Sequence, residues 1–108
     1  MANARIVNTP SQAIPQSGTT HRQRTISSSA IDLVNWTLNP LTTHVQVQFN
    51  DATARITMDG ATDPTASLGF VYVNGSSAYW TKNMISNIKA IRAGSTDVVA
   101  EIQELSFL

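Results

Sequence analysis

The sequence has no cysteine, so no disulfide can join its segments and no thiolate can bind a metal or act as a nucleophile. No apolar run approaches the roughly 18 residues of a membrane-spanning helix. The first ten residues lack the apolar stretch of a secretory signal, which predicts synthesis in the cytoplasm without Sec-type export. We therefore expect neither a disulfide-stapled nor a membrane protein.

Charge is also scarce in this chain. Charged residues make up 13% of the sequence, about half the roughly 25% of an ordinary domain. Ser, Thr, Asn and Gln supply 38 of the 108 residues, so hydroxyls and amides cover much of the surface in place of charges. The net charge is zero, although the first 31 residues contain three arginines and no acid. Long-range steering of a charged partner is accordingly expected to be weak.

A length of 108 residues corresponds to one domain. Residues 1–25 contain Pro10, Pro15 and Gly18 among polar residues, which predicts an extended N-terminal arm ahead of a folded domain at residues 26–108. Two interpretations stay open: an arm that lies on an acidic neighbour, or a short disordered tail. Under the first, the expected contact residues of the arm are Arg5, Ile6, Val7, Arg22 and Arg24.

From residue 26 the sequence is typical of strands. His44 to Phe49 alternates, with Val45, Val47 and Phe49 on one side and glutamines on the other. Further strands are expected at 26–34, 54–58, 70–73, 77–80, 88–93 and from 98 onward. Six or seven short strands with turn signals between them predict an all-β, antiparallel sandwich of the jelly-roll or immunoglobulin-like kind.

One stretch departs from this pattern. Trp80, Met84 and Ile88 recur at four-residue spacing, so a short helical turn is expected near residues 80–88 with these side chains buried.

The turns carry the glycines, asparagines and acids of the folded part. Asp59, Gly60, Asp63 and Pro64 are expected to shape one loop, because Asp bonds the backbone two residues on and Pro fixes the exit. Asn74-Gly75 between apolar runs predicts a type I′ hairpin. Gly94 is expected in a turn before the last strand. The structural turn residues are thus Asp59, Gly60, Asp63, Pro64, Asn74, Gly75 and Gly94.

No catalytic, metal or cofactor motif stands out. A zinc site would need three or four convergent ligands, and His21 and His44 with Asp59 or Asp63 do not form a recognised spacing. A calcium site at Asp59 and Asp63 would need six to eight oxygens. The few basic residues do not form the stripe expected of a nucleic-acid-binding protein. We expect a protein that is not an enzyme and binds no cofactor or nucleic acid.

Two segments together resemble a known family. They are Ile56-Thr57-Met58-Asp59-Gly60 with Asp63-Pro64-Thr65-x-Ser67-x-Gly69, and Ile91-Arg92-Ala93-Gly94-Ser95-Thr96-Asp97 with a closing strand that ends at Glu104-Leu105. Over roughly residues 45–105 the chain is similar to small single-domain β-sandwich virion proteins of tailed bacteriophages. The resemblance departs at Met58, where an aromatic often stands nearby, and at the helical stripe.

The resemblance implies a decoration or cement protein that binds the assembled capsid surface and stabilises it. The implied partner is the major capsid protein, the implied oligomer a homotrimer, and the implied location the capsid surface of a virion made in the host cytoplasm. Alternative hypotheses are another virion component, such as a head-fibre base or tail adaptor, and a carbohydrate-binding receptor module. For the last, Tyr79-Trp80 is the candidate aromatic pair, although Trp80 is expected to be buried.

Overall fold

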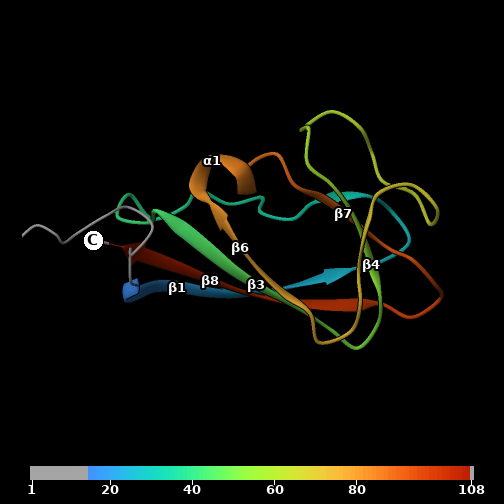
Figure 1. Ribbon diagram of the computed structural model, residues 1–108, viewed down its shortest axis with the longest axis horizontal. Helices are drawn as coiled ribbons and strands as arrows, with labels where there is room; N and C mark the ends of the chain where they lie inside the picture. The colour runs from blue at the N-terminus through green and yellow to red at the C-terminus, as the bar shows by residue number, and fades with distance from the viewer. Residues whose placement is uncertain (1–14, 108) are drawn as a thin grey trace, which may run out of the picture.

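The computed structural model describes residues 15–107, which form two packed sheets (Figure 1). The elements in chain order are β1 (Pro15–Ile26), β2 (Ile31–Asp32), β3 (His44–Asn50), β4 (Ala54–Thr57), β5 (Phe70–Tyr72), β6 (Ser77–Thr81), α1 (Lys82–Ile85), β7 (Lys89–Arg92) and β8 (Val98–Phe107). The expected all-β sandwich with one short helix is confirmed.

The strand order identifies the kind of sandwich. Sheet A has the order β1-β8-β3-β6 and sheet B the order β2-β7-β4-β5. The antiparallel pairs are nested: β1 with β8, β2 with β7, β3 with β6, and β4 with β5. Eight strands folded over in this way form a jelly roll, whereas immunoglobulin constant domains divide seven strands differently. Of the two expected topologies, the jelly roll is the one present.

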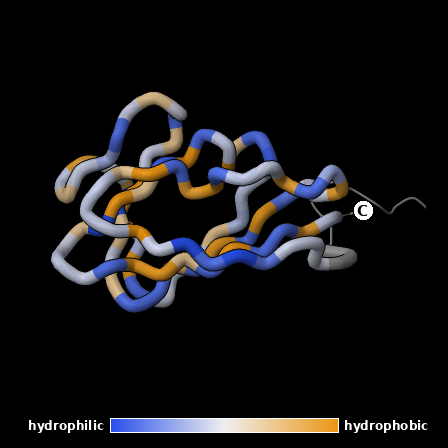
Figure 2. The backbone as a smooth tube through the Cα atoms, turned by 180° about the vertical axis from the view of Figure 1, so that it is seen from behind, coloured by the Kyte–Doolittle hydropathy of each residue, from blue (hydrophilic) through white to orange (hydrophobic). Residues whose placement is uncertain are grey.

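The core lies between the sheets and follows the alternation in the sequence. Val45, Val47 and Phe49 of β3 are fully buried, as are Ala100 and Ile102 of β8. Figure 2 shows apolar segments in both layers of the backbone. The strand predictions at 44–49 and from residue 98 are therefore confirmed, and Val45, Val47 and Phe49 share the buried side of their strand as expected.

Three aromatic rings join the two sheets near the centre of the core. The Tyr72 ring of sheet B lies 5.1 Å from Phe49 and 5.8 Å from Trp80, measured between ring centroids. Such tilted and edge-on pairs stabilise a core by roughly 0.5–1.5 kcal/mol beyond the area they bury. Trp80 is 8% exposed, so its expected burial is confirmed.

The expected boundary of the N-terminal arm is wrong. Residues 15–26 form β1, an edge strand of sheet A that pairs with β8 from Pro15↔Phe107 to Ile26↔Val98. The local sequence is polar and contains Gly18, so it does not have the pattern of a buried strand. Pairing with a partner some 80 residues away holds it in place. Residues 1–14, including Arg5, Ile6 and Val7, lie outside the described part of the chain.

The predicted Asn74-Gly75 hairpin is also wrong. β5 belongs to sheet B and β6 to sheet A, so the chain crosses between the sheets at this turn. Ser76 N donates to Val73 O at 3.0 Å and Gly75 has φ 88°, while Asn74 does not have a positive φ. This is the backbone of a type II turn, in which only the third residue needs a positive φ.

Two further expectations, the strand at 26–34 and the buried stripe near residues 80–88, are met only in part. The strand expected at 26–34 is reduced to Ile31–Asp32. The helical turn is present as α1, capped by Thr81 Oγ1, which accepts from Met84 N at 3.2 Å. Ile85 and Ile88 are buried, but Met84 is 40% exposed, so the four-residue stripe does not bury as a unit.

Candidate interaction surfaces

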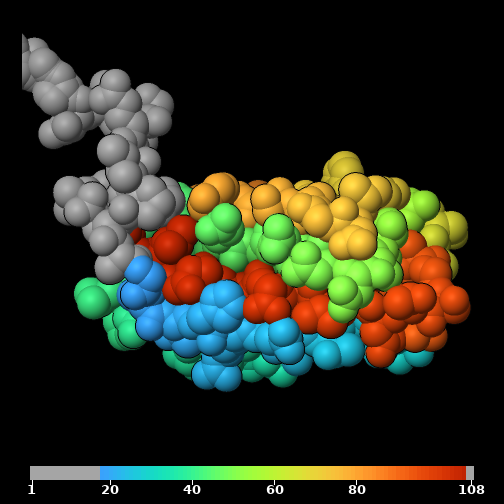
Figure 3. All heavy atoms as spheres, turned by 90° about the horizontal axis from the view of Figure 1, so that it is seen from below, coloured from blue at the N-terminus to red at the C-terminus, as the bar shows by residue number. Residues whose placement is uncertain are grey.

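The outer face of sheet A is polar along its whole width. Residues paired directly across strands share a face of the sheet, and two such rows cross all four strands. One row is His21, Gln103, Gln46 and Tyr79; the other is Gln23, Glu101, Gln48 and Ser77. We call these eight residues the polar face. Figure 3 looks onto it from outside, with β1 in blue, β8 in red, β3 in green and β6 in orange.

A hydrogen-bonded group on the polar face joins β1 to β8. His21 Nε2 lies 2.7 Å from Glu101 Oε1, and His21 Nδ1 lies 3.0 Å from Gln103 Oε1. Gln103 Nε2 donates to Thr20 O and Glu104 O, which fixes its oxygen toward the imidazole. Both ring nitrogens therefore face acceptors. The bonds to Glu101 and then Gln103 raise the pKa of His21 above its ordinary value.

The β5 side of sheet B differs in character. Leu68, Phe70, Val71 and Val73 are between 49% and 63% exposed, and we call these four residues the β5 surface. Val71 pairs with Arg55, which pairs with Ile91, so the three share the outer face of sheet B. Arg55 Nη1 donates to Gly69 O at 2.9 Å and holds the loop before β5 against the sheet. A cluster of large exposed apolar side chains on a small domain is typical of a protein-contact site.

A groove adjoins the β5 surface. Its volume is about 600 Å³, and Ile56, Thr57, Met58, Asp59, Leu68 and Phe70 contribute to its lining. Phe70 pairs with the buried Ile56, so it lies on the core-facing side of sheet B, yet it is 63% exposed because the sandwich is open there. We call this the β5 groove. Sequence patterns did not predict it, because Leu68 falls in an expected loop and Phe70 in an expected strand.

The loop at residues 59–64 mostly behaves as expected. Asp59 Oδ1 accepts from Ala61 N at 3.0 Å and Thr62 N at 2.8 Å, and Asp59 Oδ2 accepts from Thr62 Oγ1 at 2.6 Å. The Thr62 hydroxyl, followed by the backbone donors, lowers the pKa of Asp59 to about 2. Gly60 has φ 75°, which its lack of a side chain permits, and Pro64 is buried.

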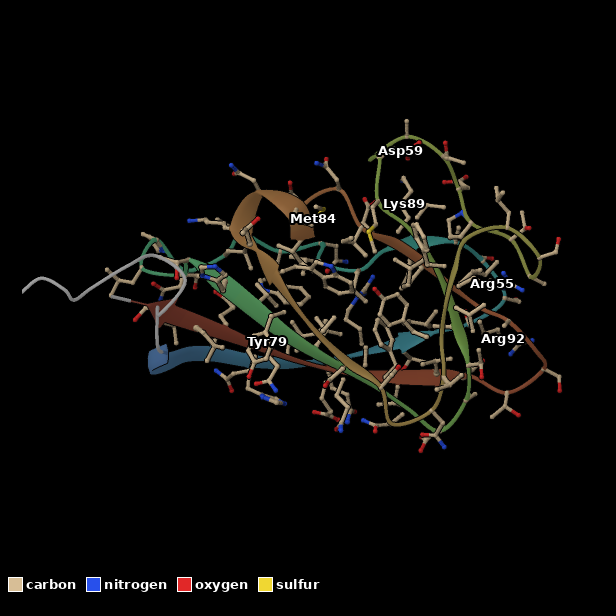
Figure 4. The ribbon with its side chains drawn as sticks, viewed as in Figure 1. Arg55, Asp59, Tyr79, Met84, Lys89 and Arg92 are labelled. Carbon is tan, nitrogen blue, oxygen red and sulfur yellow. The ribbon has the colours of Figure 1, made fainter. Side chains whose placement is uncertain are left out.

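Asp63 has a different role from the one expected. Its carboxylate lies 3.7 Å from Lys89 Nζ, which also bonds Asp32 at 3.0 Å, and it makes no bond within its own turn among the contacts described. Figure 4 shows Asp59 on the loop above Lys89, with Arg55 on the strand beside them. The bond to Asp32 is the main cause of the raised pKa of Lys89.

The remaining predicted turn residues, Asn74, Gly75 and Gly94, all lie in turns, but a glycine is needed at only one of the two glycine positions. Asn74 Oδ1 accepts from Asp51 N at 2.9 Å, and Gly75 N donates to Phe49 O, so this turn is tied to the β3–β4 turn. Gly94 lies in the turn before β8 as expected, but it has no positive φ and an added Cβ would meet nothing within 4 Å. A glycine is therefore not required at position 94.

Arg22 and Arg24, expected in a capsid-contact arm, lie on β1 and contact the edge of the sandwich. The Arg24 guanidinium donates to Asp32 O at 2.8 Å and Leu33 O at 3.2 Å, which bridges the edges of the two sheets. The Arg22 guanidinium carbon lies 4.8 Å from the centroid of the Trp36 ring. Inward-reaching charges of this kind also protect an edge strand from pairing with other chains.

A buried carboxylate was missed by the sequence prediction. Glu104 is 1% exposed and accepts from Thr42 Oγ1 at 2.7 Å, Asn39 N at 2.8 Å and Trp36 Nε1 at 3.0 Å. It therefore fixes the long β2–β3 loop to β8. The signal was available, since continuing the alternation of Val98, Ala100 and Ile102 places residue 104 inward.

Three negative findings concern metal sites, membrane-spanning helices and similarity to known proteins. Within residues 15–107, no group of three or more His, Asp or Glu side chains is placed to hold a metal ion. No helix in that range is long and apolar enough to cross a membrane. No family model, curated protein or solved structure matches this chain.

Proposed function

We propose that this chain is a structural virion protein that binds the assembled capsid of a tailed bacteriophage and stabilises it. The observation that carries the proposal is the β5 surface, with four large apolar side chains about half exposed. The two phage-like segments favour the same function, and so does the jelly roll, which recurs in viral capsid and lectin domains. Because folds host many functions, the surface and the segments bear more weight than the topology.

The contrast between the two sides of the molecule suggests how it sits on a shell. The polar face offers amides, hydroxyls and one ion pair, which water solvates well. Val71 and Val73 are exposed on the opposite sheet, and burying them against a partner would be favourable at about 25 cal/mol per Å². We place the β5 side on the major capsid protein and the polar face toward solvent. This arrangement assigns no enzymatic activity to the chain.

Binding to shells tests the proposal. The full chain is mixed with purified capsids that lack it, and the bound fraction is measured by co-sedimentation over a range of protein concentrations. We expect saturable binding that V71D/V73D weakens by about tenfold or more, since each buried anchor contributes more than about 1 kcal/mol. Gln48→Asp, on the polar face, is the matched control and should bind as the wild type. Absence of saturable binding, or equal loss in both variants, contradicts the proposal.

Glycan binding is the second candidate, favoured by one observation on the polar face. Tyr79 is 58% exposed and follows Gln103 and Gln46 in its row, which places an aromatic ring beside amide groups that could bond sugar hydroxyls. Trp80, the other half of the candidate pair, is buried and cannot stack on a sugar. Chemical-shift changes at Gln46 and Gln103 on addition of a glycan, abolished in Tyr79→Ala, would favour this function.

A further inference from the structure

The β5 groove has an edge strand as one wall. β5 pairs with β4, and within residues 15–107 no strand pairs with its other side. Leu68 and Phe70 line the groove beside this open edge. An edge strand next to a groove suits an extended peptide, because the backbone can pair with the strand while alternate side chains enter the groove. The volume of about 600 Å³ lies in the range that accommodates several side chains.

The lining specifies the chemistry of that peptide. Ile56, Met58, Leu68 and Phe70 make the groove mainly apolar. Asp59 adds a carboxylate that stays ionised across the neutral range, because its hydrogen bonds hold its pKa at about 2. The occupant that fits is thus an extended segment in which an apolar side chain and a cation two residues away enter the groove together.

The chain itself contains such a segment outside the described residues. Arg5-Ile6-Val7 places a cation directly before two β-branched apolar residues, and residues 1–14 contain no acid. β-Branched residues favour the extended conformation that pairing with an edge strand requires.

The positions of the chain ends favour a groove on another copy. Pro15 begins β1 at one end of the sandwich, and β4 lies at the other (Figure 1). The far end of β1 adjoins β4, because Arg92 N donates to Ser27 O and Arg92 pairs with Ala54. Ile6 lies nine residues before Pro15 and reaches at most about 30 Å. The twelve residues of β1 span about 36 Å.

We propose that Arg5-Ile6-Val7 of one copy occupies the β5 groove of a second copy. Val7 packs on Leu68 and Phe70, and Arg5, two residues away on the same side of the added strand, faces Asp59. Ile6 lies on the opposite side of that strand. The contact joins unlike surfaces, so it forms a ring if the rotation closes and a chain if it does not. It is independent of the capsid function and holds whether or not the protein binds a shell.

Two single variants and their mixture test this contact. Val7→Asp removes the apolar side chain that enters the groove, and Phe70→Asp disrupts the groove at a side chain that is already 63% exposed. Sedimentation velocity of the full chain should show assembly for the wild type and monomer for each variant alone. An equimolar mixture should regain a one-to-one complex, because one variant retains the groove and the other retains the segment. Met84→Asp, on exposed α1, is the control and should assemble as the wild type.

The outcomes separate the possible occupants. A wild type that stays monomeric at about 1 mM, the weak limit of specific association, overturns the proposal. So does assembly of Val7→Asp alongside monomeric Phe70→Asp, which would mean that two β5 edges meet symmetrically. Failure of the mixture to regain a complex also overturns it. If Phe70→Asp loses its far-ultraviolet circular dichroism spectrum, Leu68→Asp replaces it with the same expectations.

Discussion

Glu104 shows how one side chain can organise a loop. Burial alone raises the pKa of this carboxyl, but bonds from Thr42, Asn39 and Trp36 outweigh burial, and its pKa lies below the ordinary value. Because the pKa of Glu104 is lower in the folded chain than in the unfolded chain, the carboxylate stabilises the fold at pH values above its unfolded pKa. That stability is lost as the pH falls through the folded value.

Removal of this carboxylate should be costly. Glu104→Ala leaves the buried Thr42 hydroxyl and the part-buried donors of Trp36 and Asn39 without their acceptor, and a buried group left unpaired costs about 1–3 kcal/mol. We expect a loss of about 3 kcal/mol or more in the free energy of unfolding, measured by urea denaturation. Glu101→Ala on the exposed polar face should lose far less. Equal losses in the two variants would contradict the role given to Glu104.

Two glycines offer a matched comparison. At Gly60, alanine would need φ 75° and its Cβ would lie 2.7 Å from Asn87 Oδ1, so we expect destabilisation by about 1–2 kcal/mol. At Gly94, alanine meets nothing and the backbone does not need a positive φ, so the change should be neutral or stabilising by up to about 1 kcal/mol. Melting temperatures of Gly60→Ala and Gly94→Ala decide this, and the reverse order would refute it.

At the scale of elements, β1 is the main departure from expectation. Its contact with β8 includes the His21–Glu101 pair, whose bonds raise the pKa of His21. Because the pKa of His21 is higher in the folded chain than in the unfolded chain, its protonation stabilises the fold fully below about pH 6.5. This contribution is lost as the pH rises through the folded pKa. An NMR titration should place the His21 pKa above 6.5, and Glu101→Gln should lower it. An unchanged titration in Glu101→Gln would show that the pair does not form.

The same strand makes a truncation informative. Removing residues 1–14 leaves every contact within residues 15–107 in place. Removing residues 1–26 also deletes β1, which takes away Ile26 from the core and the pairing partner of β8. We expect cooperative thermal unfolding for the shorter truncation and none for the longer one. If a chain lacking residues 1–26 still folds, the fold does not require β1, as expected for an N-terminal arm.

The sequence predicted elements better than their pairing. Alternation along β3 and β8 specified which side chains are buried, because a strand has a period of two residues. Asn74-Gly75 correctly indicated a turn, but φ preferences do not determine which strands a turn connects. β1 escaped prediction because its strand conformation depends on β8, far along the chain. The β5 groove escaped because hydropathy does not show that Phe70 lies at an open edge.

In the whole molecule, the outer face of sheet A and the β5 side of sheet B differ in polarity. The polar face crosses sheet A, while apolar side chains gather around β5 on sheet B. A shell offers many equivalent sites for such a surface, and repeated weak contacts there add up to stable attachment. Leu68 and Phe70 belong to both the β5 surface and the β5 groove, so self-association leaves Val71 and Val73 as the part of the β5 surface that can contact the capsid.

Copy number per particle is the most direct test of the capsid function. Quantitative mass spectrometry of purified virions compares this chain with the major capsid protein. A decoration protein repeats over the shell, so the account predicts on the order of hundreds of copies per particle, in fixed ratio to the capsid protein. About six to twelve copies, the number expected on the tail axis, or absence from the virion, would contradict it.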